Sequence, residues 1–141
     1  EVKELSFMIQ SLRKKSFKIR VYYYDPDHMG VVYHANYLKW MEVARTEYFR
    51  DIFPYKEIED MGFMLPVKTL NIKYIDSVKY DDEIEIFVEI KKINNIKIEF
   101  YYEIYDKNNV LKVIAETTNV FIDINGNLKR ISKDMLAILK G

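Results

Sequence analysis

The chain has 141 residues, of which 49% are hydrophobic and 31% are charged, and its 22 basic and 22 acidic residues cancel. This length suits one globular domain, and the balanced charge argues against nucleic acid as the main partner, because phosphate binding favours a basic excess. Since the sequence contains no cysteine, disulfides, zinc–thiolate sites and a thiol nucleophile are excluded.

Residues 1–16 are interpreted as an N-terminal extension, and residues 17–141 as the main domain. Apolar residues in the extension follow a helical spacing and predict a short helix that docks on the domain or on a neighbouring subunit. The sequence has neither the apolar core of a signal peptide nor the run of about 20 apolar residues that a membrane helix needs. We therefore expect a cytoplasmic protein.

A strand and a polar turn are predicted next. Residues 17–24 alternate between apolar and polar side chains, which is typical of a strand with one buried face. Pro26 ends this strand, and Gly30 allows the tight turn that follows. The turn gathers two acids and two histidines ahead of a helix, namely Asp25, Asp27, His28 and His34.

A long helix is predicted to begin near residues 34–36, with Asn36 as its N-cap. Apolar residues recur along one side at three- and four-residue steps, namely Tyr37, Leu38, Met41, Ala44, Tyr48 and Phe49. The opposite side is polar, and Glu42 is spaced to pair weakly with Arg45 across one turn. A helix start offers unpaired N–H groups and a partial positive charge, which suit the stabilisation of an oxyanion. An acid beside it is suited to attack the carbonyl carbon.

Most of the remaining chain is predicted to form strands. A short helix or loop over residues 53–62 is begun by Pro54 and ended by Gly62. The segment 64–124 then alternates apolar with polar side chains. Asp and Asn residues that tolerate hairpin turns separate its strands, at 81–82, 94–95, 108–109 and 125–127.

The last strand is predicted over residues 119–124, and Ser132 is predicted to cap a C-terminal helix over residues 132–140. A sheet with one apolar face and a helix with an apolar stripe bury both surfaces when the sheet wraps the helix, so the predicted fold class is α+β. Because such a sheet has open edges, we expect a homodimer.

The stretch RVYYYDPDHMGVVYHANYLKWMEVARTEYFR, residues 20–50, resembles the active-site segment of the hotdog-fold acyl-CoA thioesterases. The resemblance is to the 4-hydroxybenzoyl-CoA thioesterase type and its bacterial Tol-Pal-associated relatives. The matching features are the Asp-x-Asp turn, Gly-Val-Val, and Tyr-His and Asn-Tyr at the helix start. The later stretch LPVKTLNIKYIDSVKYDDEIEI resembles the family's second and third strands. The similarity covers roughly residues 17–131 and implies a hotdog fold.

The resemblance implies hydrolysis of an acyl-CoA thioester to a free acid and CoA, with no cofactor and no metal. Asp27 is the implied catalytic carboxylate, which attacks the thioester carbonyl or activates a water to do so. His34 is implied to offer its backbone N–H to the thioester oxygen, and its side chain either to assist the leaving thiolate or to orient the acyl group. Gly30, Tyr33 and Asn36 are the implied substrate-binding neighbours, and a second subunit is implied to complete the pocket.

Two positions depart from the family's pattern. Pro26 stands where relatives usually carry a small polar residue, which stiffens the turn and leaves the acid in place. Some relatives place arginines at the hairpin around residues 94–95, where they grip the CoA phosphates. The candidates for that role in this chain are Lys91, Lys92 and Lys97.

Two metal-site interpretations fail on spacing. A calcium loop that starts at Asp25 would need an oxygen ligand at its fifth position and a glutamate at its twelfth, where the chain has Met29 and Asn36. His28 and His34 lack the helical spacing of a zinc pair, and no third ligand is evident.

Other interpretations stay open at this level. Asp27 also suits a turn-forming or helix-capping role. Glu47 is the next candidate for the catalytic acid, because another branch of hotdog thioesterases takes its carboxylate from the central helix. The alternative functions are a hotdog acyl-CoA hydratase or dehydratase and a non-catalytic acyl-CoA-binding module. The sequence also leaves open which acyl group is bound, whether CoA or acyl carrier protein is the donor, and whether the protein is a dimer or a tetramer.

Overall fold

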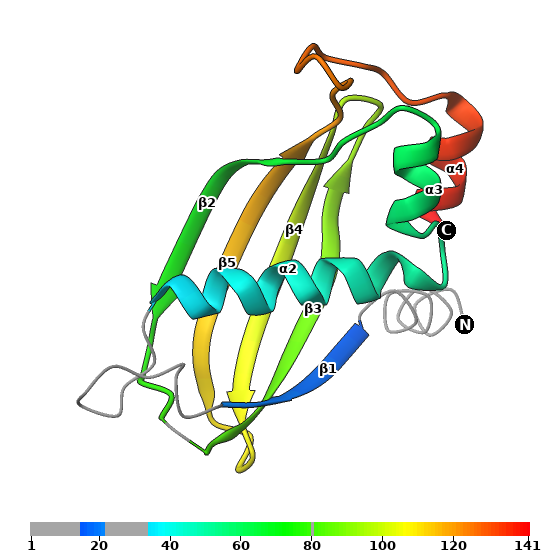
Figure 1. Cartoon of the computed structure of the whole chain (residues 1–141). Coiled ribbons are helices and arrows are strands. Elements are labelled where there is room, and N and C mark those ends of the chain that lie inside the picture. Colours follow the sequence, from blue (N-terminus) through cyan, green and yellow to red (C-terminus); the bar gives the residue numbers. More distant parts are fainter. Residues whose placement is uncertain (1–14, 22–33, 80) are drawn as a thin grey trace.

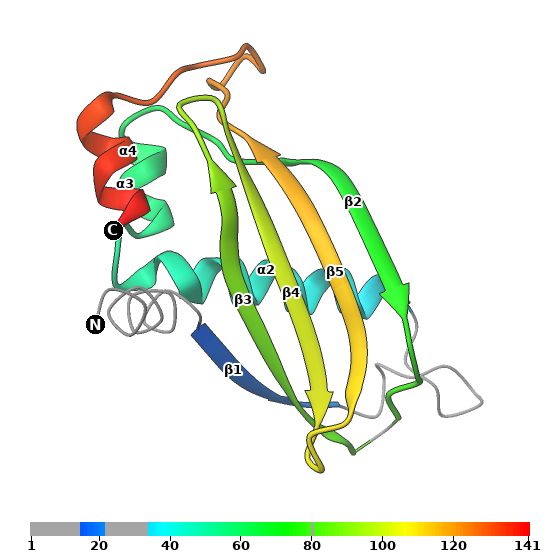
Figure 2. The same cartoon turned by 180° about the vertical axis from the view of Figure 1, so that it is seen from behind.

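An antiparallel five-stranded sheet wraps one long helix in the computed structural model, which describes residues 15–21, 34–79 and 81–141. The strands stand in the order β1-β3-β4-β5-β2, and α2 crosses one face of the sheet (Figure 1). Seen from behind, no helix of the described residues crosses the other face (Figure 2). The elements are β1 Lys15–Arg20, α2 His34–Arg50, α3 Tyr55–Asp60, β2 Val67–Tyr74, β3 Glu83–Ile93, β4 Lys97–Asp106, β5 Leu111–Val120 and α4 Lys133–Lys140.

The core lies between α2 and the inner face of the sheet. The buried residues of α2 recur at three- and four-residue steps and are at most 4% exposed, apart from Arg45: Tyr37, Trp40, Met41, Ala44, Tyr48 and Phe49. Alternate residues of β3, β4 and β5 are buried opposite them, and the rings of Phe49 and Phe100 meet edge to face at 5.7 Å. Burial of each large apolar side chain contributes roughly 1.5–3 kcal/mol, so this layer provides most of the stability.

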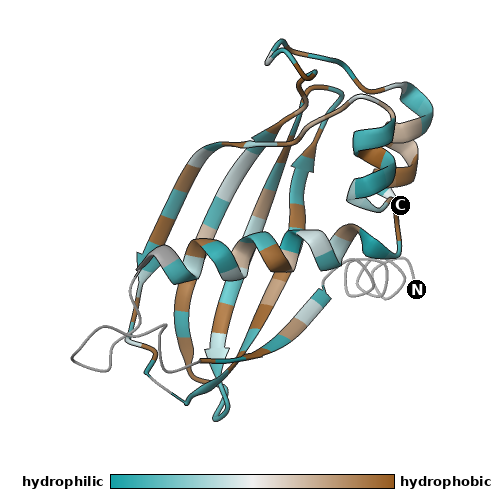
Figure 3. Ribbon diagram, viewed as in Figure 1, coloured by the Kyte–Doolittle hydropathy of each residue, from teal (hydrophilic) through white to brown (hydrophobic). Residues whose placement is uncertain are grey.

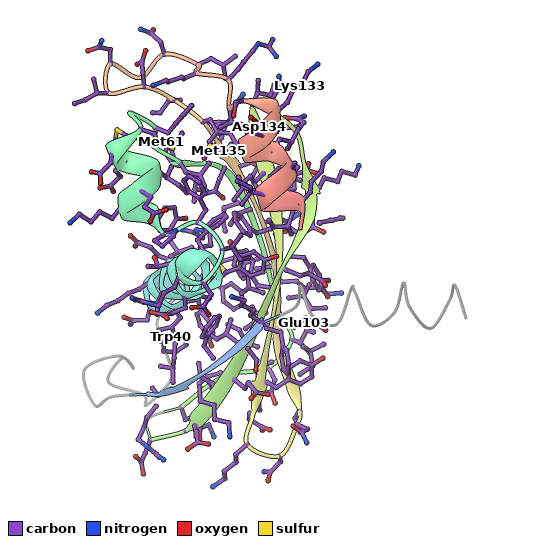
Figure 4. All side chains as sticks on the ribbon, turned by 90° about the vertical axis from the view of Figure 1, so that its right-hand side faces the viewer. Trp40, Met61, Glu103, Lys133, Asp134 and Met135 are labelled. Atoms are coloured by element: carbon purple, nitrogen blue, oxygen red, sulfur yellow. The ribbon has the colours of Figure 1, made fainter. Side chains whose placement is uncertain are left out.

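Hydropathy alternates along the strands, as the brown and teal bands of Figure 3 show. A period of two places apolar side chains on the inner face and charged side chains on the outer face. In the view along α2, Glu103 of β4 lies on the far side of the sheet from the helix (Figure 4). Its neighbour Tyr102 is fully buried on the inner side.

The two short helices lie beyond the C-terminal end of α2 (Figure 1). As predicted, Pro54 precedes α3, and the side chain of Ser132 caps α4 by accepting a hydrogen bond from the N–H of Met135 at 3.1 Å. Met135 and Leu139 of α4 are buried. None of the helices in the described ranges is long and apolar enough to cross a membrane.

Strands β1 and β2 form the two edges of the sheet. Leu70 and Tyr74 of β2 are 43% and 49% exposed, although they pair with the buried residues Thr117 and Val113 of β5. The inner face of β2 is therefore apolar but largely uncovered by the other residues that the structure describes.

The predicted α+β hotdog architecture is confirmed, and α2 begins within the predicted range. Two details of the helix prediction are wrong. Asn36 is the third residue of α2, which begins at His34, so Asn36 is not the N-cap. Leu38 is 39% exposed, although it was assigned to the buried stripe, because it points away from the sheet that covers Tyr37 and Met41.

The prediction of a strand over residues 119–124 is confirmed only in part, because Asn119 and Val120 belong to β5 and Ile122 pairs with Met64 and Leu128 in isolated bridges. β5 covers Leu111–Val120, and Ile124 beyond it is 85% exposed. The chain turns there because the side chain of Asp123 accepts hydrogen bonds from the N–H groups of Asn125 and Asn127.

β1 begins two residues before the predicted start, at Lys15. Residues 1–14 and 22–33 lie outside the described ranges. The extension over residues 1–16 and the domain over residues 17–141 therefore remain predictions.

Candidate functional site

The start of α2 is anchored against the end of β2, at one edge of the sheet (Figure 1). The ring of Tyr37 stands edge to face with the rings of Tyr74 and Trp40, at centroid distances of 5.2 and 5.1 Å. Burial raises the pKa of Tyr37 to about 12, and the phenol also hydrogen-bonds the backbone of Val78. These contacts hold α2 at Tyr37, one turn after its start at His34.

The helix start also has the electrostatic character that the sequence predicts. The first turn of α2 contains no acidic residue. The N–H groups of a first turn have no partner within their own helix and carry a partial positive charge. His34 and Asn36 both lie in this turn, so the structure places two of the predicted site residues together.

The chain enters the predicted active-site turn from a second fixed point. Val21 is 1% exposed, donates its N–H to the carbonyl of Asp82 at 2.9 Å and accepts from the N–H of Asp81 at 3.0 Å. The predicted site residues between Val21 and α2 lie outside the described residues, namely Asp27, Gly30 and Tyr33.

The three lysines that were predicted to bind CoA phosphates fall into two settings. Lys91 forms an ion pair with Glu116, with 2.7 Å between Nζ and Oε1, and this contact raises the pKa of Lys91. Lys92 and Lys97 line a cavity of about 340 Å³ at the β3–β4 hairpin. Neither has an ion-pair partner among the described residues, so both are better placed than Lys91 to bind an anion.

Arg130 adds a further positive charge at this hairpin. Its guanidinium donates to the side-chain oxygen of Asn95 at 3.4 Å, and the next N–H, of Ile131, donates to the Asn95 carbonyl at 2.9 Å. Sequence reasoning missed Arg130, because the contact depends on the path of the chain after β5. The hairpin lies at the opposite end of the sheet from the start of α2 (Figure 1), so one copy of the chain does not bring the lysines to His34.

Glu47 is engaged elsewhere. Arg50 donates from Nε and Nη2 to the two carboxylate oxygens of Glu47, at 2.8 and 2.7 Å. These hydrogen bonds lower the pKa of Glu47. A paired carboxylate with a lowered pKa is a poor general base, so the structure disfavours Glu47 as the catalytic acid. The described residues contain no cluster of three or more side chains of the types that bind metals.

Arg45 is buried, in contrast to the predicted surface pair with Glu42. It is 7% exposed, and its Nη1 donates to the hydroxyl of Tyr102 at 3.0 Å. That hydroxyl lies 2.7 Å from Oγ1 of Thr117. Burial raises the pKa of Tyr55 to about 12, while the charge of Arg45 and its hydrogen bond to Tyr55 oppose this rise. Arg45 thus joins α2, α3 and the sheet.

A cavity of about 630 Å³ opens beside Arg45, between α2, α3 and the segment that leads into β2. Its lining combines Arg45 and Tyr55 with the apolar residues Phe63 and Leu65. Sequence reasoning missed this cavity, because it is built from three elements whose packing the sequence pattern does not specify.

The chain is similar to known proteins over nearly its whole length. The family model of the thioesterase-like superfamily matches residues 21–139. This range begins at Val21 and includes the segment of Asp27, all of α2 and the four strands after it.

Individual relatives agree with the family match. A putative acyl-CoA thioesterase, YneP of Bacillus subtilis, is 36% identical over 78% of this chain and 79% of its own length. The acyl-CoA thioesterase YbgC of Haemophilus influenzae is 35% identical over 83% of this chain and 86% of its own length. The solved structure of a DHNA-CoA thioesterase from Staphylococcus aureus superimposes with a TM-score of 0.79 at 29% identity, covering 83% of this chain and 80% of that one.

Proposed function

The chain belongs to the thioesterase-like superfamily, and we propose that it hydrolyses an acyl-CoA thioester to a free acid and CoA. The observation that carries this proposal is that relatives matching most of the chain are named acyl-CoA thioesterases. The anchored start of α2, which directly follows the segment of Asp27, supports it independently. The short sequence distance between Asp27 and this helix start supports the proposal that an attacking carboxylate and an oxyanion site act together.

In the proposed reaction, Asp27 supplies the negative charge and the start of α2 the positive charge. As a general base, Asp27 takes a proton from a water whose oxygen attacks the thioester carbon; as a nucleophile, it attacks that carbon itself, and water hydrolyses the resulting anhydride. In both routes, the carbonyl oxygen becomes an oxyanion that accepts a hydrogen bond from the backbone N–H of His34. The C–S bond then breaks, CoA leaves as a thiolate, and the His34 side chain assists its departure.

Substrate binding is assigned to two groups of residues. Gly30, Tyr33 and Asn36 are proposed to line the acyl end of the site beside His34. The CoA phosphates are proposed to bind the β3–β4 hairpin through its basic side chains. Lys92 and Lys97 are the stronger candidates there, and Lys91 the weaker one because Glu116 already neutralises it.

A second copy of the chain is proposed to complete the site by pairing along β2. A twofold axis at this edge reverses the strand direction, so the start of β2 in one copy lies beside the end of β2 in the other. Since α2 starts at the end of β2 and the β3–β4 hairpin lies toward the start of β2, this pairing brings the hairpin of one copy toward the helix start of the other.

We further propose a homodimer or a tetramer of such dimers in the cytoplasm. The uncovered inner face of β2 supports pairing. The absence of cysteine from the sequence is consistent with a reducing compartment.

Thiol release from acyl-CoA thioesters by the purified protein tests the proposed function. The panel contains short, long and aromatic acyl groups and one acyl carrier protein thioester. We expect free CoA and free acid in equal amounts from at least one acyl-CoA. Intact thioester bound without turnover in native mass spectrometry would instead indicate a binding module, and a change in enoyl-CoA absorbance without thiol release would indicate a hydratase.

A further inference from the structure

Arg45 is a buried cation with no carboxylate partner among the residues that the structure describes. It is 7% exposed, and the groups that it contacts, the hydroxyls of Tyr102 and Tyr55, are uncharged. Its helix neighbour Glu42 is exposed and forms no ion pair with it within the described ranges. A buried guanidinium without a counter-charge is costly, and proteins usually compensate it with an acid or with an anionic ligand.

The cavity beside Arg45 has room for such a ligand. At about 630 Å³, it is within the size range of small-molecule sites. Phe63 and Leu65 make one part of its lining apolar, while Arg45, Tyr55 and Thr46 make another part polar. A cavity lined by apolar residues and one cation is complementary to an acyl chain that ends in a negatively charged group.

The charges around the cavity favour a carboxylate over a phosphate. Glu42 and Glu59 also line the cavity, and both are exposed. Their charges are screened by water, whereas the charge of the buried Arg45 acts in a medium of lower dielectric. They would nevertheless repel a doubly charged phosphate more strongly than a singly charged carboxylate, and a guanidinium binds a carboxylate through paired N–H donors.

We propose that this cavity binds the carboxylate at the far end of an acyl group, so that the preferred substrates are CoA monothioesters of dicarboxylic acids. The inference rests on the proposed function and names its substrate class. Arg45 is eleven residues from His34, which is about 16 Å along α2. A long acyl chain spans this distance within one copy. In the proposed pairing, the segment that leads into β2 and lines the cavity of the second copy comes toward the helix start of the first.

The test compares matched pairs of acyl-CoA substrates. One member of each pair is succinyl-, suberyl- or hexadecanedioyl-CoA, so that the far carboxylate samples short and long distances, and the other carries an isopropyl group of similar size in place of that carboxylate. We expect the wild-type protein to have a kcat/KM at least about ten-fold higher for the carboxylate member of at least one pair, since a charge-assisted contact contributes that much or more.

Three variants locate the origin of this preference. Arg45→Met is expected to reverse it, and Arg45→Lys, which keeps the charge but not the paired donors, is expected to leave a smaller preference. Arg50→Met is the matched control, because Arg50 lies on the same helix but pairs with Glu47 and does not line the cavity. It is expected to leave the preference unchanged.

The proposal and the proposed function fail in different ways. Hydrolysis with a preference for the isopropyl member of every pair would overturn the proposal and leave the thioesterase intact. An unchanged preference in Arg45→Met would also overturn it. If Arg45→Met does not fold, the wild-type comparison and Arg45→Lys still decide. If no thioester is hydrolysed, the proposed function fails. The affinities of the two intact members of each pair, measured by calorimetry, then test whether the cavity prefers the carboxylate.

Discussion

Gly62 shows how one residue fixes the loop between α3 and β2. Its φ of +87° lies in the left-handed region, and a Cβ at this position would lie 2.7 Å from Nζ of Lys129. Lys129 donates to the carbonyl of Met61 at 3.0 Å, and its ammonium lies 4.4 Å from the centre of the Phe63 ring. The lysine thus holds the loop next to the large cavity.

Replacing Gly62 by alanine is expected to destabilise the protein by about 1–2 kcal/mol through backbone strain, and by somewhat more because Lys129 must move. Gly126→Ala is the matched control, because Gly126 has a φ of +85° with nothing within 4 Å of its Cβ position. Urea unfolding measures both free energies. A larger loss for Gly126→Ala than for Gly62→Ala would contradict this account of Lys129.

Residues with local roles were predictable from the sequence, and those with distant partners were not. Gly62 as the stop of α3 and Ser132 as the cap of α4 follow from the chemistry of neighbouring residues. Arg45 does not, because its burial depends on Tyr102, which lies 57 residues away. Helical spacing alone placed Arg45 on the surface with Glu42.

At the scale of elements, the β4–β5 hairpin is held by one carboxylate. The side chain of Asp106 accepts hydrogen bonds from the N–H groups of Asn108 at 2.8 Å and Val110 at 3.0 Å. The backbone hydrogen bond from Val110, together with that from Asn108 and the charge of Lys112, lowers the pKa of Asp106 below its ordinary 3.8. The charged carboxylate therefore stabilises the folded hairpin.

Asp106→Asn is expected to lower the free energy of unfolding at neutral pH, because the amide oxygen accepts the same hydrogen bonds without the charge. A lowered folded-state pKa gives stabilisation that is present above the unfolded pKa of about 3.9 and is lost as the pH falls through the folded value. The difference between wild type and variant should therefore shrink as the pH is lowered from about 5 to 3. An equal difference at both pH values would be evidence against this contribution.

Helices and strands in which apolar residues recur with a clear period were predictable from the sequence, and the ends of these elements were less predictable. The apolar period defined α2, and period-two alternation with Asp and Asn turns defined most of the sheet. The error at the end of β5 arose because Ile122 and Ile124 continue the alternation past the last pair with β4. After Val120 the chain leaves β4, and Ile122 pairs instead with Met64 and Leu128 before the turn at Asp123. The alternation carries no sign of this change of partner.

At the scale of the whole molecule, the open edge of β2 has the clearest consequence. Leu70 and Val67 are 43% and 42% exposed on a strand that, among the strands of the described residues, pairs with β5 alone. Exposed apolar edge strands are usually paired or covered. This edge is the basis for the proposed pairing and for the proposal that a second copy of the chain completes the site.

Leu70→Glu is expected to weaken association, because a second copy would bury the new charge beside its own strand. Sedimentation velocity over a range of concentrations measures the effect. Ile138→Glu is the control, because Ile138 is 49% exposed on α4, which lies away from β2, and it should leave the mass unchanged. A monomeric wild type, or equal behaviour of the two variants, would contradict pairing along β2.

The central claim is that Asp27, in the segment before α2, is the catalytic carboxylate of thioester hydrolysis. The most direct measurement is the kcat/KM for thioester hydrolysis by Asp27→Asn beside Glu47→Gln, which alters the other candidate acid. The account predicts a loss of at least about a hundred-fold for Asp27→Asn and a change within about two-fold for Glu47→Gln. Undiminished hydrolysis by Asp27→Asn, or a comparable loss in Glu47→Gln, would contradict it.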